Sequence, residues 1–241
     1  MAFSFPKVYP ILDASILPLT GRAEFLRRLG GSLAEAGVTL LEYRNKTGVP
    51  NDRSSSLGWK TGVPNDRSSS LGWKTGDDAE LLADAAVLRA ALPAGQVKLI
   101  LDDRADLVDQ IGFDGVHVDS GDATPAEARQ LLGPERIVGT FGGGEALLPG
   151  ILAAPADYLS IGPVFPTRTK QTSKPPIGVE GVRRLRAQAG PGPVLVAVAG
   201  ITLETAPAVM AAGASVVAVA EALFHQTDPA AAFCRWVKEL G

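Results

Sequence analysis

Eight short runs rich in Val, Ile and Leu recur along this chain, and each is followed by a stretch with helical spacing of apolar residues. The runs begin at Val8, Thr39, Val97, Gly115, Arg136, Tyr158, Val194 and Ser215. They alternate little with polar residues, which is typical of parallel strands buried on both faces. This pattern predicts the α/β class and a (β/α)8 TIM barrel. An open doubly wound sheet is the alternative, but no Gly-x-Gly-x-x-Gly follows the first run, so we favour the barrel.

The expected helices lie at residues 21–37, 77–92, 104–111, 124–132, 145–153, 179–188, 203–212 and 229–240. Thr124 and Pro125 open the fourth of these as an N-cap and a first-turn residue. Because strand and helix units succeed one another along the whole chain, we expect a single catalytic domain over residues 1–241.

One segment interrupts this alternation after the second strand. Residues 47–60 read TGVPNDRSSSLGWK, and residues 61–74 repeat the same fourteen letters. Two copies fall below the period and copy number of solenoid repeats. Each copy offers only Val, Leu and Trp for burial, so we interpret residues 47–74 as a long, flexible inserted loop, with a mobile lid as the alternative. Deletion of both copies is expected to leave a folded barrel, and an unfolded double deletion would contradict this interpretation.

Composition narrows the class of protein. The net charge is −3, so nothing favours binding to nucleic acid. A single cysteine, Cys234, excludes an intramolecular disulfide and fits a reducing compartment. The chain has neither a signal-peptide pattern at its start nor an apolar run of membrane-spanning length. We therefore expect a cytoplasmic protein without a membrane partner, and a homo-oligomer remains open.

The second strand ends in residues that suggest an anionic ligand. Glu42, Arg44 and Lys46 alternate along the chain and therefore share one face of the strand. In a barrel, the carboxyl ends of the strands carry the chemistry. Two cations in such a place are costly to bury unless an anion meets them. The pattern predicts that Arg44 and Lys46 bind a phosphate-bearing substrate.

Carboxylates follow the next two strands. Asp102 and Asp103 end the third strand, and the fourth leads to Asp119 and Asp122. Hard oxygen ligands beside cations suggest Mg²⁺ bridging a polyphosphate. The alternative is structural: Asp102 and Asp103 would cap the third helix, and Asp122 the fourth.

The last strands predict a second phosphate site. The sixth strand continues into GPVFPTRTK, residues 162–170, which presents the hydroxyls of Thr167 and Thr169 and the cations of Arg168 and Lys170. An ordinary turn with a solvated basic end is the alternative. Gly200 follows the seventh strand, where barrels often seat a phosphate, whereas Glu221 after the eighth has the wrong sign for one.

Six segments together resemble the thiamine phosphate synthase family: LEYRNK, LILDDRADL, GFDGVHVDSGD, DYLSIGPVFPTRTK, VAVAGIT and GASVVAVAEAL. They occur in the family's order and cover essentially the whole chain apart from the insert, and GPVFPTRTK is the most specific of them. The resemblance implies a transferase that joins hydroxymethylpyrimidine pyrophosphate to a thiazole phosphate and releases pyrophosphate. It also implies Mg²⁺ as the cofactor and a pyrimidine carbocation formed before the thiazole nitrogen attacks.

The resemblance implies roles for matching residues. The cations that hold the pyrophosphate and carry catalysis match Arg44, Lys46 and Lys170, and the magnesium ligands match Asp103 and Asp122. The thiazole phosphate is then bound by Thr167 and Thr169, with Gly200 as the glycine of the phosphate loop.

The chain departs from the family at the remaining substrate-binding positions. Glu42 and Asp102 stand where the family usually has Gln and Asn, and Phe141, in Thr140-Phe141-Gly142, replaces a small hydroxyl residue. Ala220-Glu221 replaces a Val-Ser pair. An ionised carboxylate only accepts hydrogen bonds, whereas an amide also donates, so either one carboxyl is protonated or the pyrimidine is held differently. Two alternatives stay open: a thiazole tautomerase-like or phosphosugar-type barrel isomerase, and a non-catalytic protein that binds thiazole phosphate.

Overall fold

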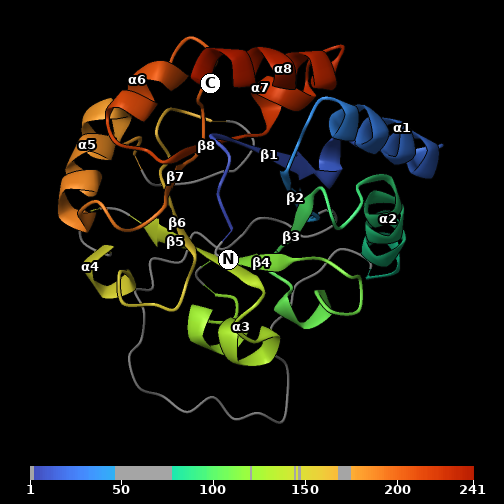
Figure 1. Ribbon diagram of the computed structural model, residues 1–241, viewed down its shortest axis with the longest axis horizontal. Helices are drawn as coiled ribbons and strands as arrows, with labels where there is room; N and C mark the ends of the chain where they lie inside the picture. Colours follow the sequence, from blue (N-terminus) through green and yellow to red (C-terminus); the bar gives the residue numbers. More distant parts are fainter. Residues whose placement is uncertain (1–2, 47–77, 120, 144, 146–147, 168–174) are drawn as a thin grey trace.

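Eight parallel strands pair in chain order and close into a barrel, because β8 pairs with β1 (Figure 1). The computed structural model describes residues 3–46, 78–119, 121–143, 145, 148–167 and 175–241, so the repeats at 47–74 lie outside the described residues. The strands are β1 (Val8–Asp13), β2 (Leu40–Arg44), β3 (Lys98–Asp102), β4 (Gly115–Val118), β5 (Ile137–Gly143), β6 (Tyr158–Ile161), β7 (Leu195–Ala197) and β8 (Val216–Val219). The prediction of a TIM barrel is confirmed, and the doubly wound alternative is wrong.

Helices surround the ring of strands (Figure 1). They are α1 (Arg22–Glu35), α2 (Asp78–Ala91), α3 (Pro125–Leu132), α4 (Leu148–Ile151), α5 (Gly178–Ala189), α6 (Ala206–Ala211), α7 (Glu221–Phe224) and α8 (Pro229–Leu240), with 3₁₀ turns η1 (Ala14–Ile16) and η2 (Ala105–Leu107). Within the described ranges, no helix has the length and hydrophobicity that crossing a membrane requires.

The helix predicted at residues 104–111 is wrong, since only the short turn η2 forms there. Asp103 has φ 67°, outside the helical region, so the segment begins as a turn. Arg104 is then held by ion pairs to Asp78 and Asp106, each at 2.7 Å.

Two further elements differ from their predictions. In the described part of residues 145–153, the helix is limited to α4. The eighth strand ends at Val219, and Glu221 begins the short helix α7 instead of continuing the strand. An apolar run such as VVAVAEAL does not by itself distinguish a strand from a helical segment, which explains this error.

Two separate apolar cores follow from the alternation of side chains along the strands. One lies between strands and helices and includes Leu41 and Tyr43 of β2. The other lies inside the barrel and includes Leu40 of β2 together with Tyr9 and Tyr158. Successive side chains of β2 point to opposite faces of the strand, so Glu42 and Arg44 lie on the same face as Leu40 and project into the barrel.

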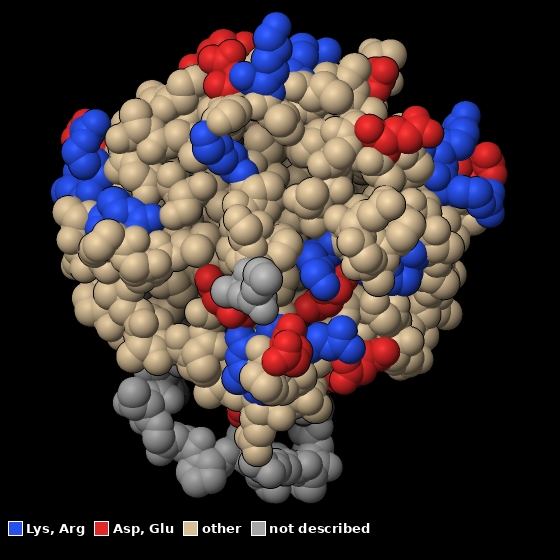
Figure 2. Space-filling view, in the orientation of Figure 1, with Lys and Arg blue, Asp and Glu red and all other residues tan. Residues whose placement is uncertain are grey.

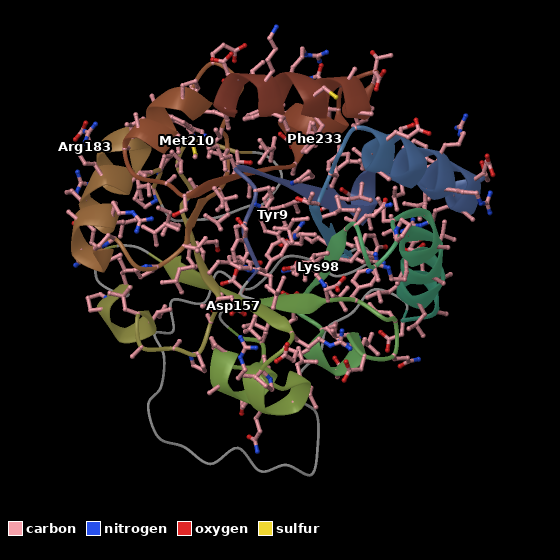
Figure 3. The ribbon with its side chains drawn as sticks, in the orientation of Figure 1. Tyr9, Lys98, Asp157, Arg183, Met210 and Phe233 are labelled. Carbon is pink, nitrogen blue, oxygen red and sulfur yellow. The ribbon has the colours of Figure 1, made fainter. Side chains whose placement is uncertain are left out.

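Aromatic rings close the N-terminal end of the barrel. Phe3 and Phe5 pack against the inner core, and the Phe5 ring meets the Tyr158 ring edge-on at 5.4 Å between centroids. Figure 3 shows Tyr9 inside the ring of strands. Ligands therefore reach the lumen from the opposite end, where the strands have their carboxyl ends.

The outer surface carries charges of both signs. On the face drawn in Figure 2, Lys and Arg side chains lie beside Asp and Glu side chains, and uncharged surface separates these groups. Among the described residues visible there, the cations form no broad single-sign patch of the kind that binds a polyanion.

Gly139 of β5 provides the space that the Tyr158 ring occupies, and this gives a stability prediction. A Cβ at residue 139 would lie 2.0 Å from Cζ of Tyr158, so Gly139→Ala is expected to lower the free energy of unfolding by about 1–3 kcal/mol. Gly31→Ala is the matched control, because residue 31 lies in α1 with open space around it and should gain about 0.5–1 kcal/mol. Urea unfolding of both variants measures the difference, and equal effects would contradict the packing role.

Candidate functional site

The carboxyl ends of β1, β2 and β3 bring charged side chains together inside the barrel. The parallel register places Asp13 of β1 beside Arg44 of β2. The Arg44 guanidinium forms an ion pair with Asp13, and its Nε lies 3.3 Å from Oδ2 of Asp102 on β3. Asp13 and Asp102 are both buried, so Arg44 neutralises two carboxylates that are largely removed from water.

Lys46 extends this cluster beyond the end of β2. Its Nζ lies 3.3 Å from Asp102 Oδ2 and 3.0 Å from Asp103 Oδ2. Burial lowers the pKa of Lys46, but Asp102 and Asp103 outweigh that effect and raise the pKa above its usual value. The Arg44 pKa is raised for the same reason, burial being outweighed by Asp102 and Asp13. Both cations therefore stay charged and available to an anionic ligand.

Asp122 joins the cluster from the segment before α3, and it does not cap that helix. Thr124 is the N-cap, and its hydroxyl and the Glu127 carboxylate form a capping box. Asp122 instead accepts a hydrogen bond from the backbone N–H of Asp119 at 2.9 Å. The helix-capping alternative for Asp122 is therefore wrong.

The same alternative fails at the end of β3. The N-cap of η2 is Arg104, and it makes no side-chain capping bond. Asp103 has its backbone N–H bonded to the carbonyl of His117 on β4 at 2.8 Å, which fixes the turn that aims its side chain at Lys46. Asp102 and Asp103 thus serve the charged cluster and leave the helix start uncapped.

The cluster holds more negative charge than its described cations neutralise, and the carboxyl pKa values show it. Burial and the neighbouring Asp102 raise the pKa of Asp103 to about 9. Burial and the same neighbour raise the pKa of Glu42 to about 8. Burial also raises the pKa of Asp122. A site with these properties gains stability from any further cation that it binds.

The donor set at Asp103 and Asp122 fits a hard divalent cation. Oδ1 of Asp103 is buried and has no hydrogen-bond partner among the described residues. The described residues contain no group of three or more His, Cys, Asp or Glu side chains arranged around one metal position. Mg²⁺ in proteins is commonly held by one or two carboxylates, with water and substrate phosphates completing its shell. Two carboxylates and one orphaned oxygen satisfy that requirement.

The predicted second phosphate site lies partly on β5, β6 and β7. Phe141 is the cross-strand neighbour of Ser160, and it lies half-buried on the lumen side of β5. Thr167 is half-buried beyond β6. Gly200 has φ 67°, and a Cβ there would lie 2.5 Å from the carbonyl oxygen of Pro166. Close backbone packing between the two loops therefore requires glycine at residue 200 with or without a ligand.

Ala220 and Glu221 line a separate hollow between β1 and β8. A cavity of about 160 Å³ is bounded there by these two residues together with Ile11, Asp13, Ser15, Ile16, Phe224 and His225. Its connection to the charged cluster is Asp13, which also pairs with Arg44. The two predicted residues thus border the cluster from the side of β8.

Not every predicted substrate-binding residue reaches the lumen. Thr140 lies on the opposite face of β5 from Gly139 and Phe141, and its hydroxyl donates to the carbonyl of Val118 at 3.0 Å. Thr169 and Lys170 lie outside the described residues.

Sequence reasoning missed three buried side chains of the lumen. Asp13 ends its strand as Asp102 does, and this position was the signal that could have revealed it. Tyr9 and Tyr158 carry no such signal, because each stands in an apolar run and reads as a core residue. Their hydroxyls nevertheless lie 3.1 Å apart, and that of Tyr9 is hydrogen-bonded to Oε2 of Glu42 at 2.9 Å.

The raised pKa of Glu42 predicts how stability depends on pH. Its folded value of about 8 exceeds the ordinary 4.5, so the native state holds a proton that the unfolded chain has lost. The stability linked to this group is complete below pH 4.5 and is lost as the pH rises through about 8, by at most about 1.4 kcal/mol per pH unit. Glu42→Gln removes this titration, so its free energy of unfolding should fall less between pH 6 and 8.

Urea unfolding in metal-free buffer at pH 6, 7 and 8 measures this difference. Glu239→Gln is the control, because Glu239 is exposed on α8 and should leave the wild-type slope unchanged. Parallel slopes for wild type and Glu42→Gln would show that Glu42 is ionised in the native state.

The family model and the curated relatives point to one family. A family model described as thiamine monophosphate synthase matches residues 8–223. A thiamine-phosphate synthase of Koribacter versatilis is 36% identical over 214 residues, which are 89% of this chain and 87% of that protein. One of Agrobacterium fabrum is 38% identical over 225 residues, 92% of this chain and 88% of that protein. The solved thiamine phosphate pyrophosphorylase from Pyrococcus furiosus has a TM-score of 0.70 at 24% identity, with 97% and 95% of the two chains covered, and shares the fold.

Proposed function

The chain belongs to the thiamine monophosphate synthase family of transferases, and we propose that it joins 4-amino-5-hydroxymethyl-2-methylpyrimidine pyrophosphate to thiazole phosphate. The products are thiamine phosphate and pyrophosphate. The bond between the pyrimidine methylene carbon and the pyrophosphate oxygen breaks, and the thiazole nitrogen forms the new bond to that carbon. Both electrons of the broken bond leave with pyrophosphate.

One observation carries the proposal: Arg44 and Lys46 stay charged in the lumen beside Asp102 and Asp103, at the carboxyl ends of β2 and β3. Half-buried cations in contact with an excess of carboxylates suit a ligand that brings both phosphate oxygens and a metal ion. An isomerase acting on a single phosphate has no need for such a set.

Positioning and charge stabilisation account for most of the proposed catalysis. Arg44 and Lys46 lie where they can hold the leaving pyrophosphate, with Lys170 as the third predicted cation. These groups stabilise negative charge as it grows on the leaving oxygen, inside a site that the barrel walls shield from water. Thr167, Thr169 and the loop at Gly200 are proposed to hold the thiazole phosphate.

Asp103 and Asp122 are proposed to hold Mg²⁺. When bound, the ion supplies Lewis-acid neutralisation of the pyrophosphate oxygens. The two aspartates contribute the charge and the hard oxygen ligands that this ion prefers, and the raised pKa of Asp103 means that binding displaces a proton.

The test measures thiamine phosphate and pyrophosphate from both substrates, with the full-length chain, with and without Mg²⁺. We expect equal amounts of both products and dependence on Mg²⁺. Lys46→Gln should lower the rate at least about a hundredfold, whereas Lys238→Gln, on the exposed face of α8, should match wild type. A folded protein that yields neither product would instead support an isomerase or a binding protein.

A further inference from the structure

Five side chains from four strands, β1, β2, β4 and β6, form one hydrogen-bonded chain across the barrel lumen. It starts at Glu42, whose Oε2 lies 2.9 Å from the Tyr9 hydroxyl. The Tyr9 and Tyr158 hydroxyls lie 3.1 Å apart, and the Tyr158 hydroxyl lies 3.1 Å from Nδ1 of His117. His117 Nε2 lies 3.5 Å from Oγ of Ser160. The mechanism above uses none of the four side chains that follow Glu42 in this series.

This chain of hydrogen bonds lies in a closed environment. Tyr9 and Tyr158 are each 1% exposed, and the Phe5 ring seals the N-terminal side. The imidazole of His117 stacks on the Tyr158 ring with an interplanar angle of 18°. Because a buried hydroxyl that loses its partner costs free energy, the hydroxyls must keep their bonds whatever the protonation of Glu42.

The available protons allow two directions of donation along this chain of hydrogen bonds. An ionised Glu42 can only accept, so Tyr9 donates to it, Tyr158 donates to Tyr9, and His117 must carry its proton on Nδ1 to donate to Tyr158. Ser160 then donates to Nε2 of His117.

A neutral Glu42 permits the reverse direction. Glu42 donates from Oε2 to Tyr9, Tyr9 to Tyr158, and Tyr158 to an unprotonated Nδ1 of His117. His117 then carries its proton on Nε2 and donates to Ser160, whose own proton reaches the carbonyl of Thr140 at 3.5 Å. Every member is satisfied in both directions.

We propose that Tyr9, Tyr158 and His117 are positioning residues that occupy Oε2 of Glu42 in either protonation state and leave Oε1 as an acceptor for the substrate. The proposal rests on the proposed function only in naming that substrate group, the exocyclic amino group of an aminopyrimidine. In the described part of the chain, Glu42 makes a single side-chain hydrogen bond, between its Oε2 and the Tyr9 hydroxyl. Oε1 of Glu42 therefore accepts a hydrogen bond as the oxygen of an amide does, and any proton on Glu42 stays on Oε2, beside the Tyr9 hydroxyl.

The groups that face Glu42 favour the neutral state at neutral pH. Tyr9 of β1, Asp102 of β3, Tyr158 of β6 and the cations Arg44 and Lys46 surround it. Burial and Asp102 outweigh Tyr9 and the two cations, which raises the Glu42 pKa to about 8. The tyrosine pKa values are raised well above 10 by burial, so neither hydroxyl ionises in the same range.

The first test reads the tautomer of His117 by ¹⁵N NMR of the histidine rings between pH 7 and 10, without substrates. The chain has two histidines, and His225→Gln assigns the signals. We expect the Nε2–H tautomer at pH 7 and the Nδ1–H tautomer once Glu42 ionises. Glu42→Gln should hold the Nε2–H form throughout, because its amide N–H₂ can donate to Tyr9. A wild-type tautomer that never changes, or a change that persists in Glu42→Gln, would overturn the coupling.

The second test separates positioning from packing. Tyr9→Phe should raise the KM for the pyrimidine substrate about tenfold while kcat stays within about threefold, because Glu42 loses the bond that orients it. The KM for the thiazole phosphate should not move. Tyr43→Phe is the matched control, since this buried hydroxyl bonds Asp84 on the outer side of β2. Equal KM values for wild type and Tyr9→Phe would overturn the positioning role.

The two tests distinguish this proposal from the proposed function. If the wild-type chain makes no thiamine phosphate but its His117 tautomer changes with Glu42, the relay stands and the assigned reaction is wrong. If the protein makes thiamine phosphate but the His117 tautomer is constant, the assigned reaction stands and the coupling of His117 to Glu42 is wrong.

Discussion

Asp103→Asn is expected to lower the rate of thiamine phosphate formation at saturating substrates by about 10²–10³-fold. The substitution keeps the size of the side chain and removes its charge. Asp103 is one of the two carboxylates proposed to hold Mg²⁺. Oδ1 of Asp103 is buried without a hydrogen-bond partner in the described structure, so its purpose is unexplained unless a ligand meets it. Rates measured across a series of Mg²⁺ concentrations should show weaker dependence on the ion as well as a lower maximum.

Stability separates this effect from damage to the fold. The pKa of Asp103 is raised to about 9 by burial and Asp102, so its ionised form opposes folding in the absence of metal. Without metal, Asp103→Asn should therefore unfold at the same or a higher urea concentration than wild type at pH 8. Asp109→Asn is the control, because Asp109 is exposed and pairs with Arg136 on the surface. An active Asp103→Asn protein with normal Mg²⁺ dependence would remove Asp103 from the metal site.

The barrel could be predicted because its signal repeats eight times and tolerates local errors. Runs such as VKLILDD and VLVAVAG must be buried on both faces, and only parallel strands under helices satisfy that demand. The prediction failed where one residue decides the outcome, as at Asp103, whose positive φ replaces the expected third helix by a turn. A propensity summed over a window does not detect a single residue of this kind.

The polar ends of β2 and β3 could also be predicted, since the period of a strand places Glu42 and Arg44 on one face. The structure brings them together with Lys46, Asp102 and Asp103, as the barrel geometry requires. Which partner each residue meets depends on strand register, and register is a property of the closed sheet. Tyr9 and Tyr158 become neighbours only through that closure.

Arg44→Ala is expected to abolish measurable activity and to lower the free energy of unfolding by about 3–5 kcal/mol. Arg44 pairs with Asp13 and Asp102, and its side chain is 14% exposed. Its removal leaves two buried carboxylates facing Glu42 with one cation, Lys46, to neutralise them. Burying unpaired charge is among the few single changes that cost this much.

A second substitution tests whether charge is the cause. Asp13→Asn combined with Arg44→Ala removes one of the two uncompensated buried charges. The double variant should therefore recover about 1–2 kcal/mol of the free energy of unfolding that Arg44→Ala loses. It should recover no activity, because the pyrophosphate still lacks its cation. Arg27→Ala is the surface control: its pair with Glu24 is 61% exposed on both sides and should be worth less than about 1 kcal/mol. If the double variant is no more stable than Arg44→Ala, the guanidinium acts through packing, since only a charge effect can be relieved by neutralising its partner.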